Sequence, residues 1–225
     1  MATLALFDVD GTLISGAISH WLAFSEAFRK VYGVEADASV IKCHGMTDWQ
    51  IIVEVLRKSG LDDNMINAKM TECMSVMEKC FAKAVATDDI RLLNGVMDTL
   101  KELESREVRM GIVTGNLRSI ALGKMKKVGL ERFLKLGGFG NDSADRARLV
   151  QLAIERAESE FGAKFGNVFL FGDTPRDIEA GKKAAVKTVG VATGIYSKQQ
   201  LSEVGADFVL DDLSDTPKVL KIVLA

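Results

Sequence analysis

The chain has 225 residues, of which 48% are hydrophobic and 27% charged, a composition typical of a globular protein. Its formal net charge of -2 provides no basic surface for a nucleic acid partner. Three cysteines without metal-ligand spacing and only two histidines argue against a disulfide scaffold and a structural zinc site. We find no targeting leader and no apolar run of the roughly 18 residues that span a bilayer, so we expect a cytoplasmic protein with no membrane partner.

The first predicted strand, residues 4–8, ends in two carboxylates. Its apolar run is typical of a strand buried on both faces. Burial of that run places Asp8 and Asp10 on the same side of the strand's carboxyl end, where their charges repel. A divalent cation with oxygen ligands is the natural compensating charge, and Gly11 permits a sharp turn beside a ligand. The alternative is an ordinary turn rich in Asp and Gly.

The interval from residue 16 to 88 differs from the rest because it contains no convincing strand. The predicted helices there span residues 17–32, 47–59 and 62–84. In the last of them, apolar residues from Met70 to Phe81 recur at helical spacing, which indicates a face packed on neighbouring helices. We therefore predict an all-helical insertion after the first strand.

Beyond the insertion, short apolar strands alternate with helices. The predicted strands are residues 108–113, 167–171, 186–191 and 207–210, and the predicted helices are 117–128, 145–161, 175–184 and 197–203. Such alternation implies right-handed crossovers and a parallel sheet with helices on both faces. The predicted organisation is thus an α/β core domain of residues 1–15 and 89–225 with a helical domain of residues 16–88.

A second strand ends in Thr114-Gly115-Asn116, directly before a predicted helix. A hydroxyl and free N–H groups at a helix N-terminus suit an anion such as phosphate. Simple capping of the helix by Thr or Asn is the alternative interpretation.

A third strand ends in Gly172-Asp173 and leads into a helix that carries Asp177 in its first turn. If this strand neighbours the first one, four carboxylates meet at one sheet edge, and that arrangement requires a metal. Oxygen ligands without a nearby histidine favour Mg²⁺ over zinc. A merely favourable interaction of Asp177 with the helix dipole is the alternative.

A cation is also needed near a phosphate and a group of acids, and the segment before the helix 145–161 offers two arginines. Either Arg146 or Arg148 could serve, and either could instead be a solvated charge or a partner of Asp142 or Asp145. We favour Arg146.

The aspartate pair, the Thr-Gly-Asn strand end, the basic residue and Gly-Asp-Thr-x-x-Asp, in that order, resemble the haloacid dehalogenase superfamily over nearly the whole chain. The helical insertion resembles the cap of its phosphoglycolate phosphatase-like members. The resemblance implies a Rossmann-like core in which Asp8 is the nucleophile, Asp10 the general acid and base, and Thr114 a ligand of the phosphoryl group. It also implies that Asp8 and Asp173 hold Mg²⁺, with Asp177 close by and Asp10 contributing its backbone carbonyl.

Two departures from the family pattern matter. The third motif of the family usually offers Lys, often followed by Pro, whereas this chain has Arg146 and Arg148. Arginine is a planar fork that keeps its proton, so the charge role is preserved but the detail changes. The presence of Asp at both 8 and 10 separates the chain from the dehalogenases, which lack the second Asp.

The implied function is a Mg²⁺-dependent phosphatase that hydrolyses a small, phosphoglycolate-like metabolite through an aspartyl-phosphate. A phosphomutase of the β-phosphoglucomutase type is the alternative on the same scaffold. A non-enzymatic binding protein is a second alternative, although it would typically have lost one of the aspartates. No oligomeric state follows from the sequence. The predicted substrate-binding residues are Gly11, His44, Thr47, Gly115 and Asn116. Thr47 is included because Gly45-Met46-Thr47-Asp48 resembles the substrate-facing segment of the family's cap, and His44 because it lies beside Gly45. The alternative for both cap residues is packing inside the insertion.

Overall fold

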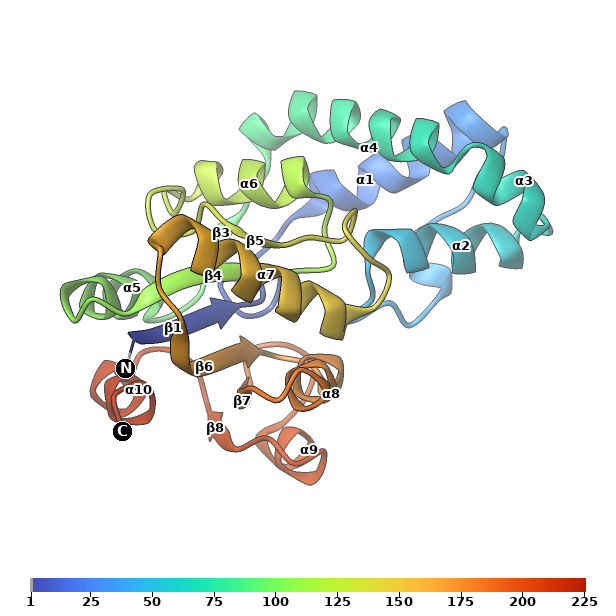
Figure 1. Cartoon of the computed structure of the whole chain (residues 1–225). Helices are drawn as coiled ribbons and strands as arrows, with labels where there is room; N and C mark the ends of the chain where they lie inside the picture. The colour runs from blue at the N-terminus through green and yellow to red at the C-terminus, as the bar shows by residue number, and fades with distance from the viewer. Residues whose placement is uncertain (1) are drawn as a thin grey trace.

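The computed structural model describes residues 2–225 and consists of a parallel sheet with helices on both faces, topped by a helical insertion (Figure 1). Six strands lie in the order β5-β4-β1-β6-β7-β8, and every pairing is parallel. The strands are β1 (Ala2–Phe7), β4 (Arg109–Val113), β5 (Gly137–Gly138), β6 (Phe165–Gly172), β7 (Lys187–Val191) and β8 (Phe208–Leu210). The predicted α/β class is confirmed.

The central strand β1 shows why the sheet is covered on both faces. Successive side chains of a strand point to opposite faces, and here both sets are apolar. Ala5 and Phe7 pack with α5, α6 and α10, whereas Leu4 and Leu6 pack with α7 and α8. The core helices are α5 (Val96–Ser105), α6 (Arg118–Lys127), α7 (Arg146–Phe161), α8 (Pro175–Lys183), α9 (Lys198–Glu203) and α10 (Thr216–Val223).

The strand order places three carboxyl ends side by side. β1 pairs with β4 on one side and with β6 on the other. The chain builds β4 and β5 outward from β1, then crosses back to begin β6 on the opposite side. Ligands of open α/β sheets bind in the crevice at such a reversal of strand order. The loops after β1, β4 and β6 therefore define the place for a site.

The insertion, called the cap here (residues 16–88), forms a separate layer beside the carboxyl ends of the strands (Figure 1). Its helices are α1 (Ile18–Ala27), extended by a π-helical turn (Phe28–Tyr32), α2 (Asp48–Lys58), α3 (Asp63–Ala68) and α4 (Met70–Ala84). They enclose a hydrophobic core of their own, which includes the buried side chains of Met70, Met77 and Phe81. That core also receives Leu117 and Ile120 from the sheet domain, so the cap packs on the start of α6.

Some elements differ from the prediction. The predicted helix 62–84 is two helices, because the backbone of Lys69 leaves the helical region at φ -117°. Two short strands that were not predicted, β2 (Ile14–Ser15) and β3 (Arg91–Leu92), pair antiparallel where the chain enters and leaves the cap. Helices α5 and α10 and strand β5 were also not predicted. None of the helices within residues 2–225 combines the length and the apolarity needed to cross a bilayer.

Candidate active site

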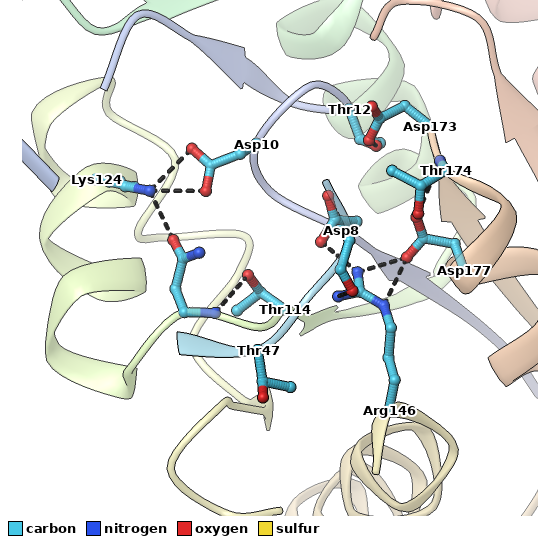
Figure 2. Close-up of polar contacts among 12 residues, drawn as sticks. Asp8, Asp10, Thr12, Thr47, Thr114, Lys124, Arg146, Asp173, Thr174 and Asp177 are labelled. Atoms are coloured by element: carbon cyan, nitrogen blue, oxygen red, sulfur yellow. Dashed lines mark hydrogen bonds and ion pairs between the residues drawn. The ribbon is translucent and has the colours of Figure 1, made fainter. Parts of the chain in front are cut away.

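Three buried carboxylates gather at the carboxyl end of the sheet. Asp8 directly follows β1, Asp173 directly follows β6, and Asp177 lies in the first turn of α8. One oxygen from each lies within 4.8 Å of the others, and all three residues are buried. We call Asp8, Asp173 and Asp177 the acidic cluster (Figure 2).

Glycines on two loops make room for the carboxylate of Asp173. A Cβ placed on Gly11 or on Gly194 would overlap its oxygen atoms, and Gly11 also has a positive φ of +86°. The hydroxyl of Thr12 donates a hydrogen bond to Asp173 Oδ1 at 3.2 Å. Gly11 and Thr12 therefore position the carboxylate of Asp173, which follows the neighbouring strand.

Asp177 is held by the helix in which it lies. Its Oδ2 accepts hydrogen bonds from the backbone N–H and the hydroxyl of Thr174, at 3.1 and 2.6 Å, which tie it to the N-terminus of α8. Its Oδ1 accepts from Arg146 Nε at 2.8 Å. Both oxygens of Asp177 are thus engaged by protein donors, so it orients Arg146 and adds negative charge to the acidic cluster.

Of the two candidate arginines, the structure places Arg146 in the site and Arg148 outside it. Arg146 is the first residue of α7, and its Nη2 donates to Asp8 Oδ1 at 2.6 Å while the same guanidinium binds Asp177. Its Nη1 also reaches the backbone carbonyl of Gly45 in the cap, at 3.4 Å. Arg148, two residues on, is exposed and pairs with Glu155 at 2.8 Å.

The acidic cluster carries more negative charge than Arg146 balances. Burial is the largest cause that raises the pKa of Asp8 well above its usual range; Arg146 opposes the rise, and the charges of Asp177 and Asp173 add to it. Burial, together with the charge of Asp177, raises the pKa of Asp173 to about 7. A buried set of carboxylate oxygens whose negative charge is only partly balanced fits a hard divalent cation such as Mg²⁺.

The side chain of Asp10 has different neighbours from those of the acidic cluster. It points away from the acidic cluster and toward Lys124 of α6 (Figure 2). Lys124 Nζ donates to the two carboxylate oxygens of Asp10 at 2.8 and 2.7 Å and to Asn116 Oδ1 at 2.7 Å. The ammonium group also lies 3.0 Å from Nδ1 of His20 in α1 of the cap. Lys124 is completely buried, so this contact set replaces water around its charge.

The chain of contacts continues into the cap. His20 Nε2 lies 3.2 Å from Asp48 Oδ2, and the same Asp48 oxygen accepts the backbone N–H of Leu117 at 2.8 Å. The backbone N–H of Asp48 donates to the carbonyl of Gly115 at 2.8 Å. We call Asp10, Lys124, Asn116, His20 and Asp48 the Lys124 network. It joins two cap helices to the loop after β4 and to α6.

The pKa of Asp10 is shifted in the opposite direction to the pKa values of Asp8 and Asp173. Burial alone would raise the pKa of Asp10, but that pKa is lowered, chiefly by the charge and the hydrogen bonds of Lys124. The side chain of Asp10 still keeps 41% of its surface exposed, because it borders a cavity. Its side chain takes no part in the acidic cluster; the backbone contact with a metal remains a prediction.

The cavity, of about 270 Å³, lies between the acidic cluster and the cap. Asp8, Asp10 and Thr114 line it from the core, and His44 and Trp21 line it from the cap. The hydroxyl oxygen of Thr114 accepts the backbone N–H of Asn116 at 3.2 Å. Since that bond uses an acceptor position, the hydroxyl proton of Thr114 is available to a ligand.

The predicted substrate-binding residues divide into two groups. Gly11 and His44 line the cavity, and their contact with a substrate stays a prediction. Thr47 lies outside the lining, because it is buried and caps α2 by accepting the N–H of Gln50 at 3.3 Å. Gly115 and Asn116 border the cavity, but their main contacts are elsewhere: Asn116 holds Lys124, and Gly115 lies so close to the cap that a Cβ would overlap the carbonyl of Met46.

Sequence reasoning missed Lys124 altogether. A signal was present, because Lys124 shares its helix face with the apolar residues Ile120 and Ala121. A charged side chain at such a position requires a buried partner. The partner could not be named from the sequence, since Asp10 and His20 lie 114 and 104 residues away in the chain.

Comparison with known proteins decides the family. Residues 5–191 match the model of a family described as haloacid dehalogenase-like hydrolase. The chain belongs to this family. The predicted membership and the prediction that the chain is an enzyme are therefore confirmed.

Individual relatives of this haloacid dehalogenase-like hydrolase carry several names. The pyrophosphatase PpaX of Listeria innocua is 28% identical over 224 residues, which covers 97% of this chain and 96% of that protein. A predicted phosphoglycolate phosphatase from Haemophilus somnus has a similar structure, with a TM-score of 0.71 and 18% identity over 97% of each chain. A putative β-phosphoglucomutase from Thermotoga maritima matches with a TM-score of 0.63 and 19% identity, over 99% of this chain and 100% of that one. These structural similarities confirm that the chain has the fold of the phosphoglycolate phosphatase-like proteins.

Proposed function

We propose that this chain is a Mg²⁺-dependent phosphatase that hydrolyses a small phosphorylated metabolite through an aspartyl-phosphate on Asp8. One observation carries the proposal: a buried guanidinium, Arg146, contacts Asp8 in a cluster of three carboxylates whose negative charge it balances only in part. A nucleophilic carboxylate, a fixed cation and a place for a divalent ion are what phosphoryl transfer to an aspartate requires.

The residues divide the reaction into two steps. The first step requires an ionised Asp8 and a protonated Asp10. A carboxylate oxygen of Asp8 bonds to phosphorus, the bond from phosphorus to the leaving oxygen breaks, and that oxygen takes the proton that Asp10 carries. In the second, a water molecule gives a proton to Asp10 and attacks phosphorus, which releases phosphate and restores the Asp8 carboxylate. Two easier steps replace one difficult step, and positioned proton transfer contributes typically about 10²–10⁴-fold.

Other groups orient the phosphoryl oxygens. The hydroxyl proton of Thr114 faces the cavity, and the guanidinium of Arg146 lies beside Asp8, so both suit a negative oxygen. Asp8 and Asp173 would hold Mg²⁺, with Asp177 adding charge close by. When bound, the ion would neutralise charge on the transferred phosphoryl group.

The substrate is proposed to be small, since the cavity holds about 270 Å³. A phosphoglycolate-like ester is the first candidate. Inorganic pyrophosphate is the second, because the Listeria relative that matches over nearly the whole chain is named a pyrophosphatase. Both candidates have a leaving group that carries negative charge, and the Lys124 network places positive charge beside Asp10.

The test is release of inorganic phosphate from 2-phosphoglycolate, pyrophosphate and p-nitrophenyl phosphate, with Mg²⁺ and with a chelator. We expect turnover only with the metal, and a loss of at least about 10⁴-fold in kcat for Asp8→Asn. Asp98→Asn, an exposed carboxylate on α5, is the matched control and should keep full activity. Acid-quenched enzyme should yield a phosphorylated peptide containing Asp8.

Three results would contradict the proposal: turnover by Asp8→Asn at the wild-type rate, turnover that is independent of a divalent cation, or no phosphate release from any of these compounds. Conversion of a sugar 1-phosphate to its 6-phosphate without net release of phosphate would instead support the phosphomutase alternative.

A further inference from the structure

Lys124 is the point at which the cap and the general acid and base meet. We propose that Lys124 is a positioning residue for Asp10, and that His20 and Asp48 of the cap hold Lys124 in place. The leaving-group side of the site is then complete only while the cap is docked on the core. This inference rests on the proposed function, because it uses the role of Asp10 in transferring a proton to the leaving group.

The hydrogen bonding of Lys124 fixes its direction. An ammonium group has three donors and no acceptor. Around Nζ lie the carboxylate of Asp10, the amide oxygen of Asn116 and Nδ1 of His20, each within 3.0 Å. A buried lysine with all of its donors engaged has one orientation, because any rotation would leave a buried donor unsatisfied. The partly exposed Asp10 is therefore held by an ammonium group whose position is fixed.

The cap completes this arrangement through His20. Since Nδ1 of His20 accepts from the lysine, Nε2 carries the ring proton and donates it to Asp48 Oδ2. Asp48 accepts the N–H of Leu117 with the same oxygen, next to the first turn of the helix that carries Lys124. One cap carboxylate thus secures both the histidine and the start of α6.

The direction imposed on Asp10 matters for chemistry. Its carboxylate is turned away from the acidic cluster and toward Lys124 (Figure 2). Asp10 lines the cavity together with His20 and Trp21 of the cap. A phosphoryl group bound at Asp8 would place its leaving group on that side. Without Lys124, no buried cation directs Asp10 there, and an error of about 1 Å in a catalytic group can cost about 10²-fold in rate.

Lys124→Met tests the inference because methionine has a similar length and no charge. We measure kcat/KM for 2-phosphoglycolate, whose alkoxide must be protonated, and for p-nitrophenyl phosphate, whose phenolate leaves without a proton. We expect a loss of about 10²-fold for the first substrate and a loss at least about tenfold smaller for the second. Lys126→Met, an exposed lysine on the same helix, is the matched control and should change neither value.

His20→Phe examines the cap side and serves if Lys124→Met folds poorly. Phenylalanine keeps the ring that stacks on Phe24 but removes the acceptor of the lysine. We expect the same dependence on the leaving group with a smaller loss, of about tenfold. The double variant should lose no more than Lys124→Met alone, because residues that act through one another are not additive.

The outcomes separate the two hypotheses. Suppose that Asp8→Asn abolishes turnover but Lys124→Met lowers kcat/KM equally for both substrates, or for neither. The phosphatase function is then supported and the positioning role of Lys124 is overturned. Additive losses in the double variant would overturn the link through the cap. If wild-type enzyme releases no phosphate from any substrate, the proposed function fails first. In that case, unchanged hydrogen exchange at the amides of Asp48 and Leu117 in His20→Phe would also overturn the docking contact.

Discussion

The acidic cluster and the Lys124 network lie on two sides of one cavity, yet they are built in different ways. The carboxylates of the acidic cluster come from the loop after β1, the end of β6 and the start of α8, all in the core. The Lys124 network takes two of its five residues from the cap. The carboxylates of the acidic cluster are thus fixed by the core, whereas the surroundings of Asp10 depend on the cap.

The electrostatics of the two regions also differ. The pKa values of Asp8 and Asp173 are raised by burial, and those carboxylates need a further cation. The pKa of Asp10 is lowered against the effect of burial, chiefly by the charge and the hydrogen bonds of Lys124. We infer that metal binding acts on the acidic cluster and cap docking acts on the Lys124 network. Variants should therefore separate the two.

The largest effect is expected for Arg146→Met. Arginines that stabilise a transferring phosphoryl group contribute about 10³–10⁵-fold, so we expect kcat to fall by at least about 10³-fold. Because we propose that Arg146 binds the phosphoryl oxygens, turnover of 2-phosphoglycolate and of p-nitrophenyl phosphate should fall equally. Arg148→Met is the control and should leave turnover unchanged, since Arg148 pairs only with surface groups. A loss confined to 2-phosphoglycolate would assign Arg146 to the leaving-group side instead.

A smaller effect is expected for Gly115→Ala, which touches no charge. Its Cβ would overlap the backbone of Met46 and press the cap away from the loop after β4. We expect a loss of about 10²-fold in kcat/KM for 2-phosphoglycolate and a smaller one for p-nitrophenyl phosphate, the same signature as Lys124→Met. Both tryptophans, Trp21 and Trp49, lie in the cap, so their fluorescence reports the displacement. Equal losses for both substrates would contradict the separation of the two regions.

The core could be predicted from the sequence because its signals are local. An apolar run that ends in a carboxylate marks both β1 with Asp8 and β6 with Asp173, and parallel strands bring such ends together. Helix α5 was not predicted even though Val96, Leu100 and Leu103 recur at helical spacing and are buried. Strand β5 consists of two glycines and offers no apolar pattern to detect.

The cap side of the site could not be predicted in the same way. Thr47 was expected to bind substrate, but a Thr followed three residues later by Gln is also a capping box, and the structure shows that role. The function of Lys124 depends on contacts between residues more than 100 positions apart. Such pairings follow from tertiary packing, which local spacing does not encode.

Mg²⁺ should stabilise the wild-type protein through the acidic cluster. At a concentration of about 100 times Kd, binding contributes about 2.7 kcal/mol, which corresponds to roughly 5–10 °C in Tm for a chain of this size. Asp173→Asn should lose most of this increase, whereas Lys124→Met and Asp98→Asn should keep it. Thermal unfolding by circular dichroism, with Mg²⁺ or with a chelator, provides the measurement. Loss of the increase in Lys124→Met would show that the two regions are coupled.

Without a divalent cation, the stability of the protein should also depend on pH. Asp173 has a pKa of about 7 in the folded protein, against an ordinary value of 3.8. Between these values the folded state holds a proton that the unfolded state has lost. Stability therefore falls as the pH rises from about 4 to about 7, and this contribution becomes constant at higher pH.

We expect this fall in stability to come from the acidic cluster and not from the Lys124 network. The pH profile therefore distinguishes the two regions. The raised pKa of Asp8 acts in the same direction as that of Asp173, whereas the lowered pKa of Asp10 affects stability only at more acidic pH. Asp173→Asn should flatten the fall in Tm between about pH 4 and 7, and saturating Mg²⁺ should reverse it, because the ion binds the ionised carboxylates. Asp98→Asn should keep the wild-type profile. A wild-type Tm that rises over this interval with a chelator present would mean that the carboxylates are already balanced, and that the acidic cluster needs no metal.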